Sequence, residues 1–351
     1  MIICSCYSLF TLLDIIIEDD SIISSPQYLI ISMVYLNLGV LVLNRLINAR
    51  HSVRFAEELK RDSGRTVESG RHLPEFWLRT AVSAAFLGML HYKYRKFTDM
   101  STTAIVVQTT LPLGCCVYAG STMEGQYTAA CGALAQEFAS VNSRARGLRR
   151  DLQPDIRRDL RDQWAATERL ARLSDAHCRL VRLVRLFNDE YGAPIFFTTA
   201  GLLLSQIYAL NDIVSVVFVS DTFEATYECY AYVLDALTWT FAWVRLWWIC
   251  YRADDLTGQV HLTAKIMLEN DINSYTENTR KMALDFLDQL LHRHVRITAW
   301  GFYDVNKELL FMVLGYQFGL CLICTQFTTS GIQLVNNLTT VQKNSTYSME
   351  N

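Results

Sequence analysis

Gln326 lies near the end of an otherwise apolar segment, where a side-chain amide can hydrogen bond to another helix or to a passing solute. At about 100° per residue, a helix would place it on one face with small and aliphatic residues. That face consists of Gly315, Gly319, Leu322, Ile323 and Ser330, while Phe327 would lie beside Leu320 and Ile323. The pattern suits either close helix packing, helped by the G-x-x-x-G of the two glycines, or the lining of a pore. The spacing alone leaves both open.

A second candidate site combines aromatic rings with hydrogen-bonding groups inside two other apolar segments. Such a combination suits a small polar or amphipathic ligand. The candidate ligand-binding residues are Asp235, Trp239, Trp243, Tyr208, Asn211 and Tyr232, with Tyr230 and Asp212 nearby. The alternative is an aromatic belt at the membrane interface with a partly hydrated Asp235. Arg245, near the other end of its segment, is explained most simply by snorkelling.

Enzyme and metal signatures are absent from the sequence. It contains no G-x-S-x-G, no H-E-x-x-H and no phosphate-binding glycine loop. His292 and His294 are two residues apart, so a helix would point them to different faces. The ten cysteines show no zinc-site spacing, and the C-x-x-C of Cys321 and Cys324 lies in an apolar segment. We therefore predict no enzyme activity, cofactor, metal or nucleic-acid partner.

The elements that must position these residues are membrane spans. The chain has 351 residues, of which 51% are hydrophobic, and these are grouped in blocks. A span needs about 20 mostly apolar residues. Segments that fit are 27–47, 76–92, 103–119, 193–219, 229–250 and 309–327, and a shorter one at 1–17 reads as a first helix without the features of a signal peptide. We predict an all-α membrane protein with seven transmembrane helices.

Basic residues orient the spans, because loops rich in Lys and Arg stay in the cytoplasm. The loop 48–75 holds six of them, and the stretch 141–190 holds twelve arginines. Both lie on one side if the spans alternate, which makes the amino terminus cytoplasmic and the carboxy terminus extracellular. Asn337 and Asn344 in the tail are glycosylation acceptors that only an extracellular segment could use. The short basic loop 93–96 disagrees with this orientation.

Two cytoplasmic regions carry amphipathic patterns. Residues 144–187 alternate Arg with acidic residues and carry apolar positions at helical spacing, with a break at Pro154. Its arginines form a solvated face or contact anionic lipid head groups. A second helix, over about 272–297, has a broad apolar stripe that must pack against something. The partner is either the Arg-rich helix of the same chain or a neighbouring subunit.

The segment from residue 175 to 327 resembles the insect gustatory receptors. The resemblance is sharpest in Phe286-Leu287-Asp288-Gln289-Leu290 and in Thr298-Ala299-Trp300-Gly301-Phe302, and Gln326-Phe327 is also present. The family motif in the last helix is Thr-Tyr, five mostly hydrophobic residues, then Gln-Phe. Gly319-Leu320 stands here where Thr-Tyr would be.

The resemblance implies a tastant-gated, non-selective cation channel, built as a tetramer with itself or with related receptors in the plasma membrane. The last helix of each subunit would line the pore, with Gln326, Phe327, Ile323 and Gly319 as pore and gate residues. Its partners would be a small-molecule tastant, permeating cations and membrane lipid.

We divide the chain into six regions. They are 1–138 with transmembrane helices 1–4 and the first cytoplasmic loop, 139–191 as the Arg-rich cytoplasmic loop, 192–250 with helices 5 and 6, 251–307 as cytoplasmic anchor helices, 308–328 as the pore-lining helix and 329–351 as the extracellular tail.

Two alternatives remain at this point. A heptahelical G-protein-coupled receptor would need the opposite orientation. A transporter would be expected to show paired, Gly- or Pro-broken spans in two repeated halves, and the sequence shows no such repeat.

Overall fold

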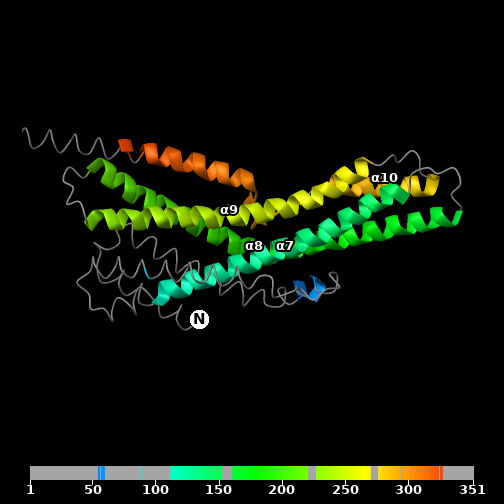
Figure 1. Cartoon of the computed structure of the whole chain (residues 1–351), viewed down its shortest axis with the longest axis horizontal. Coiled ribbons are helices and arrows are strands. Elements are labelled where there is room, and N and C mark those ends of the chain that lie inside the picture. Colours follow the sequence, from blue (N-terminus) through cyan, green and yellow to red (C-terminus); the bar gives the residue numbers. More distant parts are fainter. Residues whose placement is uncertain are drawn as a thin grey trace, which may run out of the picture.

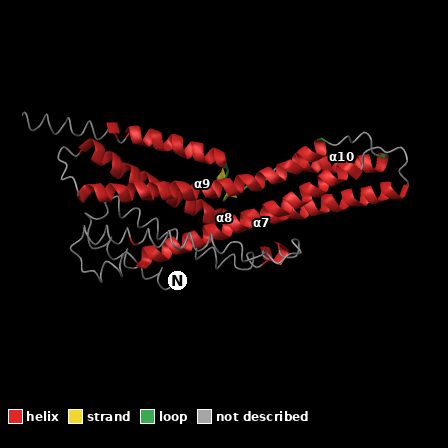
Figure 2. Cartoon of the chain, in the orientation of Figure 1, coloured by secondary structure: helices red, strands yellow, loops and turns green. Residues whose placement is uncertain are grey.

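The computed structural model of the chain describes residues 54–55, 57–59, 88, 111–151, 160–219, 227–269, 276–293, 295–323 and 325–326. Within these ranges the protein is helical, apart from short connections and one small hairpin (Figure 2). The prediction of a helical protein is confirmed for this part of the chain. The predicted spans 1–17 and 27–47, nearly all of the span 76–92, and the tail with Asn337 and Asn344 lie outside the described residues.

Three long helices form the body of the molecule. They are α7 (Leu111–Asp151), α8 (Leu160–Val219) and α9 (Tyr227–Leu268), and each packs against the other two (Figure 1). α8 has 60 residues and is therefore about 90 Å long at 1.5 Å per residue. It continues through Pro194, and α7 and α8 end and begin on either side of Pro154. The predicted region boundaries after residues 138, 191 and 250 all fall inside these helices.

No helix in the described ranges is long and apolar enough to cross a membrane. The spans predicted at 193–219, 229–250 and 309–327 coincide with parts of α8, α9 and the last helix, and they stay predictions.

Large aromatic side chains join α7 and α8 in the core. Tyr127 of α7 packs against Phe187 and Tyr191 of α8, and the Phe187 ring centroid is 5.2 Å from that of Tyr127 and 4.9 Å from that of Tyr191. Phe55, in the predicted first cytoplasmic loop, packs on the same cluster at 6.1 Å from Phe187. All four side chains are buried. The structure thus places part of the loop 48–75 against the end of the Arg-rich stretch of α8.

Two sets of buried polar side chains form pairs between α7 and α9. Asn142 donates to the backbone oxygen of Gln259 at 2.9 Å and accepts from the hydroxyl of Thr263 at 2.6 Å. Nearer the other end, Arg245 Nε donates to Glu124 Oε2 at 3.0 Å, and a second bond joins the same two side chains. The explanation of Arg245 by snorkelling was wrong. Its guanidinium stays inside the helix pair because Glu124, 121 residues away in sequence, neutralises it there.

The helix predicted at 272–297 is shorter in the structure. α10 (Glu277–His292) ends at Arg293, and the following residues form a hairpin of β1 (Thr298–Ala299) and β2 (Tyr303–Asp304). α10 packs on α8, where Phe286 meets the ring of His177 at 5.8 Å and Thr279 hydrogen bonds to Thr167 at 2.7 Å. The apolar stripe therefore has a partner in the Arg-rich helix of the same chain, as one of the two alternatives predicted.

Candidate functional site

The last helix covers residues 307–323, with residues 325 and 326 also helical. It begins where the Asn306 side chain accepts a hydrogen bond from the backbone N–H of Leu309 at 3.1 Å, which satisfies one free donor of the first turn. Lys307 pairs with Asp254 of α9 at 2.5 Å. In Figure 1 the helix, in orange, runs beside α8 and α9 at the end of the molecule away from α10.

The two sides of this helix differ sharply. Leu309, Val313 and Gln317, four residues apart, are buried, and we call them the inner seam. Most of the remaining circumference is exposed and apolar, whereas Leu310, Leu320 and Cys321 are partly buried. Its exposed apolar residues and glycines are Phe311, Met312, Leu314, Gly315, Tyr316, Phe318, Gly319, Leu322 and Ile323. Phe311 is 74% exposed, so this outer face has no cover within the described chain. One chain therefore buries only a narrow stripe of the helix.

The hairpin that precedes the last helix contains a tight two-residue turn. β1 and β2 are antiparallel, with Thr298 opposite Asp304 and Ala299 opposite Tyr303. Trp300 and Gly301 have φ values of 52° and 76°, and Phe302 N–H bonds to the oxygen of Ala299 at 3.0 Å. Positive φ at both central residues is the pattern of a type I′ turn, which fits the twist of short hairpins. Gly301 adopts it freely, whereas Trp300 is strained there.

α8 holds this hairpin on one side. Asn188 donates to the oxygen of Arg296 at 2.7 Å and accepts from the N–H of Thr298 at 3.3 Å. Gly192, one turn further, lies so close to the hairpin that an added Cβ would meet Trp300 N at 3.0 Å. Thr199 and Tyr303 join through their hydroxyls. The base of the last helix is thus fixed to α8 by polar contacts and by close backbone approach.

Further along the inner seam, the last helix meets α8 through two amides. Gln317 Nε2 donates to Gln206 Oε1, and both side chains are buried. The sequence analysis did not select either residue. The available signal was weak: Gln206 interrupts the apolar stretch of α8, and Gln317 lies nine residues before Gln326, about 180° around the helix.

The predicted pore residues lie on the outer face as far as they are described. Gly319 is exposed and has open space around its Cα, Ile323 is 49% exposed, and Gln326 is exposed. Gly315 and Leu322 of the predicted face are exposed as well. Phe327 lies outside the described residues. The structure brings the described residues to one surface, and their role in a pore stays a prediction.

The predicted ligand-binding residues are only partly described. Trp239 and Trp243 pack edge to face on α9, with ring centroids 6.0 Å apart and an angle of 65°. Both rings are half-buried, and their indole N–H groups have no hydrogen-bond partner among the described residues. The side chains of Asp235, Tyr208, Asn211 and Tyr232 lie outside the described residues. Of the predicted ligand-binding side chains, the structure therefore describes those of the two tryptophans.

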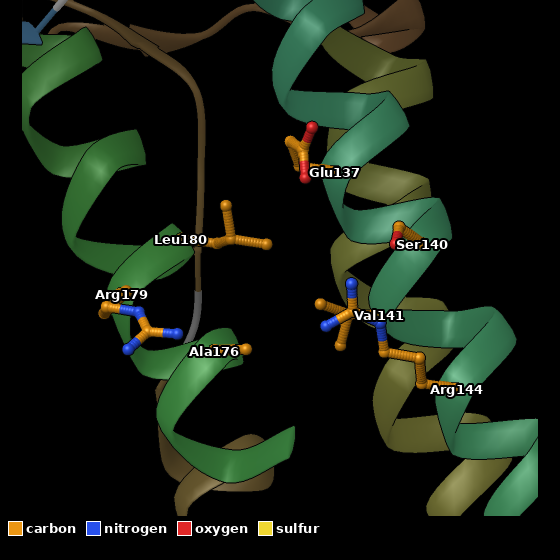
Figure 3. A pocket seen from close by; sticks show the side chains of 7 residues that line it. All are labelled: Glu137, Ser140, Val141, Arg144, Ala176, Arg179 and Leu180. Atoms are coloured by element: carbon orange, nitrogen blue, oxygen red, sulfur yellow. The ribbon is translucent and has the colours of Figure 1, made fainter. Parts of the chain in front are cut away.

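A small pocket lies elsewhere, between α7 and α8 (Figure 3). It is lined by Glu137, Ser140, Val141 and Arg144 of α7 and by Ala176, Arg179 and Leu180 of α8. Two exposed guanidinium groups and one carboxylate face this space, so it has mixed charge. None of the predicted ligand-binding residues lines it.

His177 is the one described histidine with a strongly displaced pKa. It is buried between the rings of Phe138 and Phe286, at 5.5 and 5.8 Å. Burial, and to a smaller degree the positive charge of Arg293, lower the pKa of its imidazole to about 4. The imidazole is therefore neutral at physiological pH and serves as part of the contact between α7, α8 and α10.

Comparison with known protein families decides the class. A family model described as the 7tm chemosensory receptor matches residues 1–330. The chain belongs to this family. The resemblance predicted from the sequence is thereby confirmed at the level of insect chemosensory receptors, and the family is one of membrane receptors rather than of enzymes. No curated protein sequence matches the chain.

Solved structures with the same fold include those of an insect olfactory receptor. The chain is similar to the receptor OR5 from Machilis hrabei in complex with eugenol, with a TM-score of 0.62, 12% identity, and coverage of 93% of this chain and 88% of that chain. A second structure of the same receptor gives a TM-score of 0.60, 12% identity, and coverage of 92% of this chain and 85% of that chain. At this identity the likeness concerns the fold of the chemosensory receptor.

Proposed function

We propose that this chemosensory receptor is a gustatory receptor acting as a tastant-gated, non-selective cation channel in the plasma membrane of sensory neurons. The observation that supports it is the last helix, which buries a narrow stripe against its own chain and leaves a large apolar face exposed. An apolar outer face of this extent needs lipid or other subunits. Four copies, of this chain or of related receptors, would cover part of it and leave Gly319, Ile323, Gln326 and Phe327 around a central pore.

The proposed orientation puts the amino terminus and the Arg-rich stretch of α8 in the cytoplasm. α8 is about 90 Å long, whereas the hydrocarbon core is about 30 Å thick, so much of it must lie outside the membrane. α10 packs on the part of α8 that precedes the predicted span, and Phe55 packs near it. This arrangement supports a cytoplasmic helical anchor that is connected to the last helix through the hairpin. An accessible epitope tag at the amino terminus of intact cells would contradict it.

The ligand would bind among the outer ends of the predicted spans, with Trp239 and Trp243 contributing rings and indole N–H donors. Asp235, Tyr208, Asn211 and Tyr232 are the proposed polar and aromatic partners. Eugenol, bound by the related OR5 receptor, is a first compound to test on this chain. A response to volatile compounds only would assign the receptor to smell instead of taste.

Whole-cell current recording tests this function. Cells expressing the chain are exposed to a panel of tastants and to eugenol, with extracellular sodium or N-methyl-D-glucamine and with GDPβS in the pipette. We expect an inward current that needs sodium and persists with GDPβS. A response that GDPβS abolishes would contradict the channel and favour the G-protein-coupled alternative.

A further inference from the structure

Gln206 and Gln317 form a buried amide pair with unused hydrogen-bonding capacity. Gln206 is 0% exposed and Gln317 is 3% exposed. Besides the bond from Gln317 Nε2 to Gln206 Oε1, the Nε2 of Gln206 and the Oε1 of Gln317 have no hydrogen-bond partner among the described residues. Buried polar groups are costly when unpaired, so this single bond between the amides carries more weight than one at the surface.

The pair lies at the end of an otherwise apolar seam. Leu309 and Val313 make the first two contacts of that seam, and apolar contacts are not directional. A hydrogen bond requires both a distance and an angle. Sliding the helix by one residue would move Gln317 by about 1.5 Å along the axis and by about 100° around it, which breaks the bond. The amide pair therefore fixes the register of the last helix on α8 where the apolar contacts would allow slip.

That register also sets the direction of the outer face. Gln317 and Gln326 are nine residues apart, so they lie about 180° apart around the helix. Any rotation that moves the buried amide turns Gln326, Ile323 and Gly319 by the same angle. The buried amide on one side is thus coupled through a rigid helix to the predicted gate residues on the other.

We propose that Gln206 and Gln317 are positioning residues that set the rotation of the last helix and, through it, the open probability of the pore. The part concerning open probability rests on the proposed channel function. The part concerning rotation does not, because it follows from the seam alone. The two parts are therefore tested by separate measurements in the same set of variants.

The variants are Gln206→Leu, Gln317→Leu and the double variant Gln206→Leu/Gln317→Leu, with Gln136→Leu on an exposed position of α7 as matched control. Each single variant leaves one buried amide opposite a leucine, whereas the double variant restores an apolar match. Rotation is read by the rate at which MTSET labels Gln326→Cys in a background with Cys321→Ala and Cys324→Ala. Open probability is read from the sodium current without added ligand at equal surface expression.

We expect both single variants to change the labelling rate about tenfold in the same direction, and the double variant to return within about threefold of the starting receptor. The current without ligand is expected to change in both single variants and to return towards the starting value in the double variant. Unchanged labelling in the single variants, or effects that simply add in the double variant, would overturn the proposal. If the labelling rates change as expected but the receptor carries no current, the proposed role in helix rotation would stand and the proposed channel function would be overturned.

Discussion

Gln317 and Gln326 are two identical side chains on opposite sides of one helix, in opposite surroundings. Gln317 is buried in the inner seam and bonded to Gln206, whereas Gln326 lies on an exposed face of apolar residues. The seam is complete within one chain. The outer face is not, because it leaves several large apolar side chains uncovered. The inner seam therefore contributes to the folding of the subunit, whereas the outer face is the surface that the subunit presents to lipid or to other subunits.

The same division applies to the molecule as a whole. Between α7 and α9 several polar side chains pair with one another in the interior, as with Glu124 and Arg245 or Asn142 and Thr263. Substitutions there should affect folding. Substitutions on the outer face should leave the isolated subunit almost unchanged and act on assembly or conduction.

The largest effect is expected from Glu124→Leu. The variant leaves Arg245, whose side chain is 19% exposed, without its carboxylate partner, and breaking such a buried pair typically costs about 3 kcal/mol or more. The unfolding temperature of the receptor in detergent should fall by several degrees. The matched control is Glu124→Leu/Arg245→Leu, which should recover most of the loss. A double variant as unstable as the single one would show that the pair does not act as a unit.

Gly192→Ala and Gly319→Ala make the same substitution in the interior of the subunit, against the hairpin, and on the outer face of the last helix. A Cβ on Gly192 would meet backbone atoms of Trp300 at 3.0 and 3.3 Å, so the hairpin must shift, at about 1–3 kcal/mol. A Cβ on Gly319 meets nothing within 4 Å. We expect a lower unfolding temperature for Gly192→Ala alone. Equal losses in both variants would mean that the outer face is closed within the subunit.

His177 makes the stability of the interior dependent on pH. Its pKa is about 4 in the folded chain against 6.5 for an unperturbed imidazole. Between these values the unfolded chain binds more protons, so stability is lost as the pH falls from about 6.5 towards about 4. Unfolding temperatures measured across this range should decline less steeply in His177→Leu. An identical slope in the variant would assign the pH dependence to other groups.

The sequence predicted the last helix and the residues that share one of its faces because both depend on local periodicity, and it left open whether that face packs against helices or lines a pore. Gly315, Gly319, Leu322, Ile323 and Gln326 share a face at 100° per residue whatever the rest of the chain does. The structure places them on the exposed side of that helix. The Arg-rich helices were predictable for the same reason, whereas the partner of α10 was left open between the Arg-rich helix of the same chain and a neighbouring subunit.

The pairings across the fold could not be predicted in this way. Glu124 and Arg245 are 121 residues apart and Gln206 and Gln317 are 111 apart, so no spacing rule connects them. Arg245 taken alone fits snorkelling, since the neutralising carboxylate is supplied only by the packing of α7 on α9. The hairpin was missed because strands of two residues carry no alternation. Its signal was the Trp300-Gly301 pair, whose positive φ values favour a tight turn.

The relative permeability of sodium and potassium, measured from reversal potentials, tests the account most directly in Gln326→Ala and Gln317→Ala. Both variants remove one glutamine amide from the same helix. We expect Gln326→Ala to change the permeability ratio, because its amide would face the permeating ions, while surface expression stays intact. We expect Gln317→Ala to change the current size but not the ratio. An unchanged ratio in Gln326→Ala, in a receptor that still conducts, would contradict the placement of the outer face at the pore.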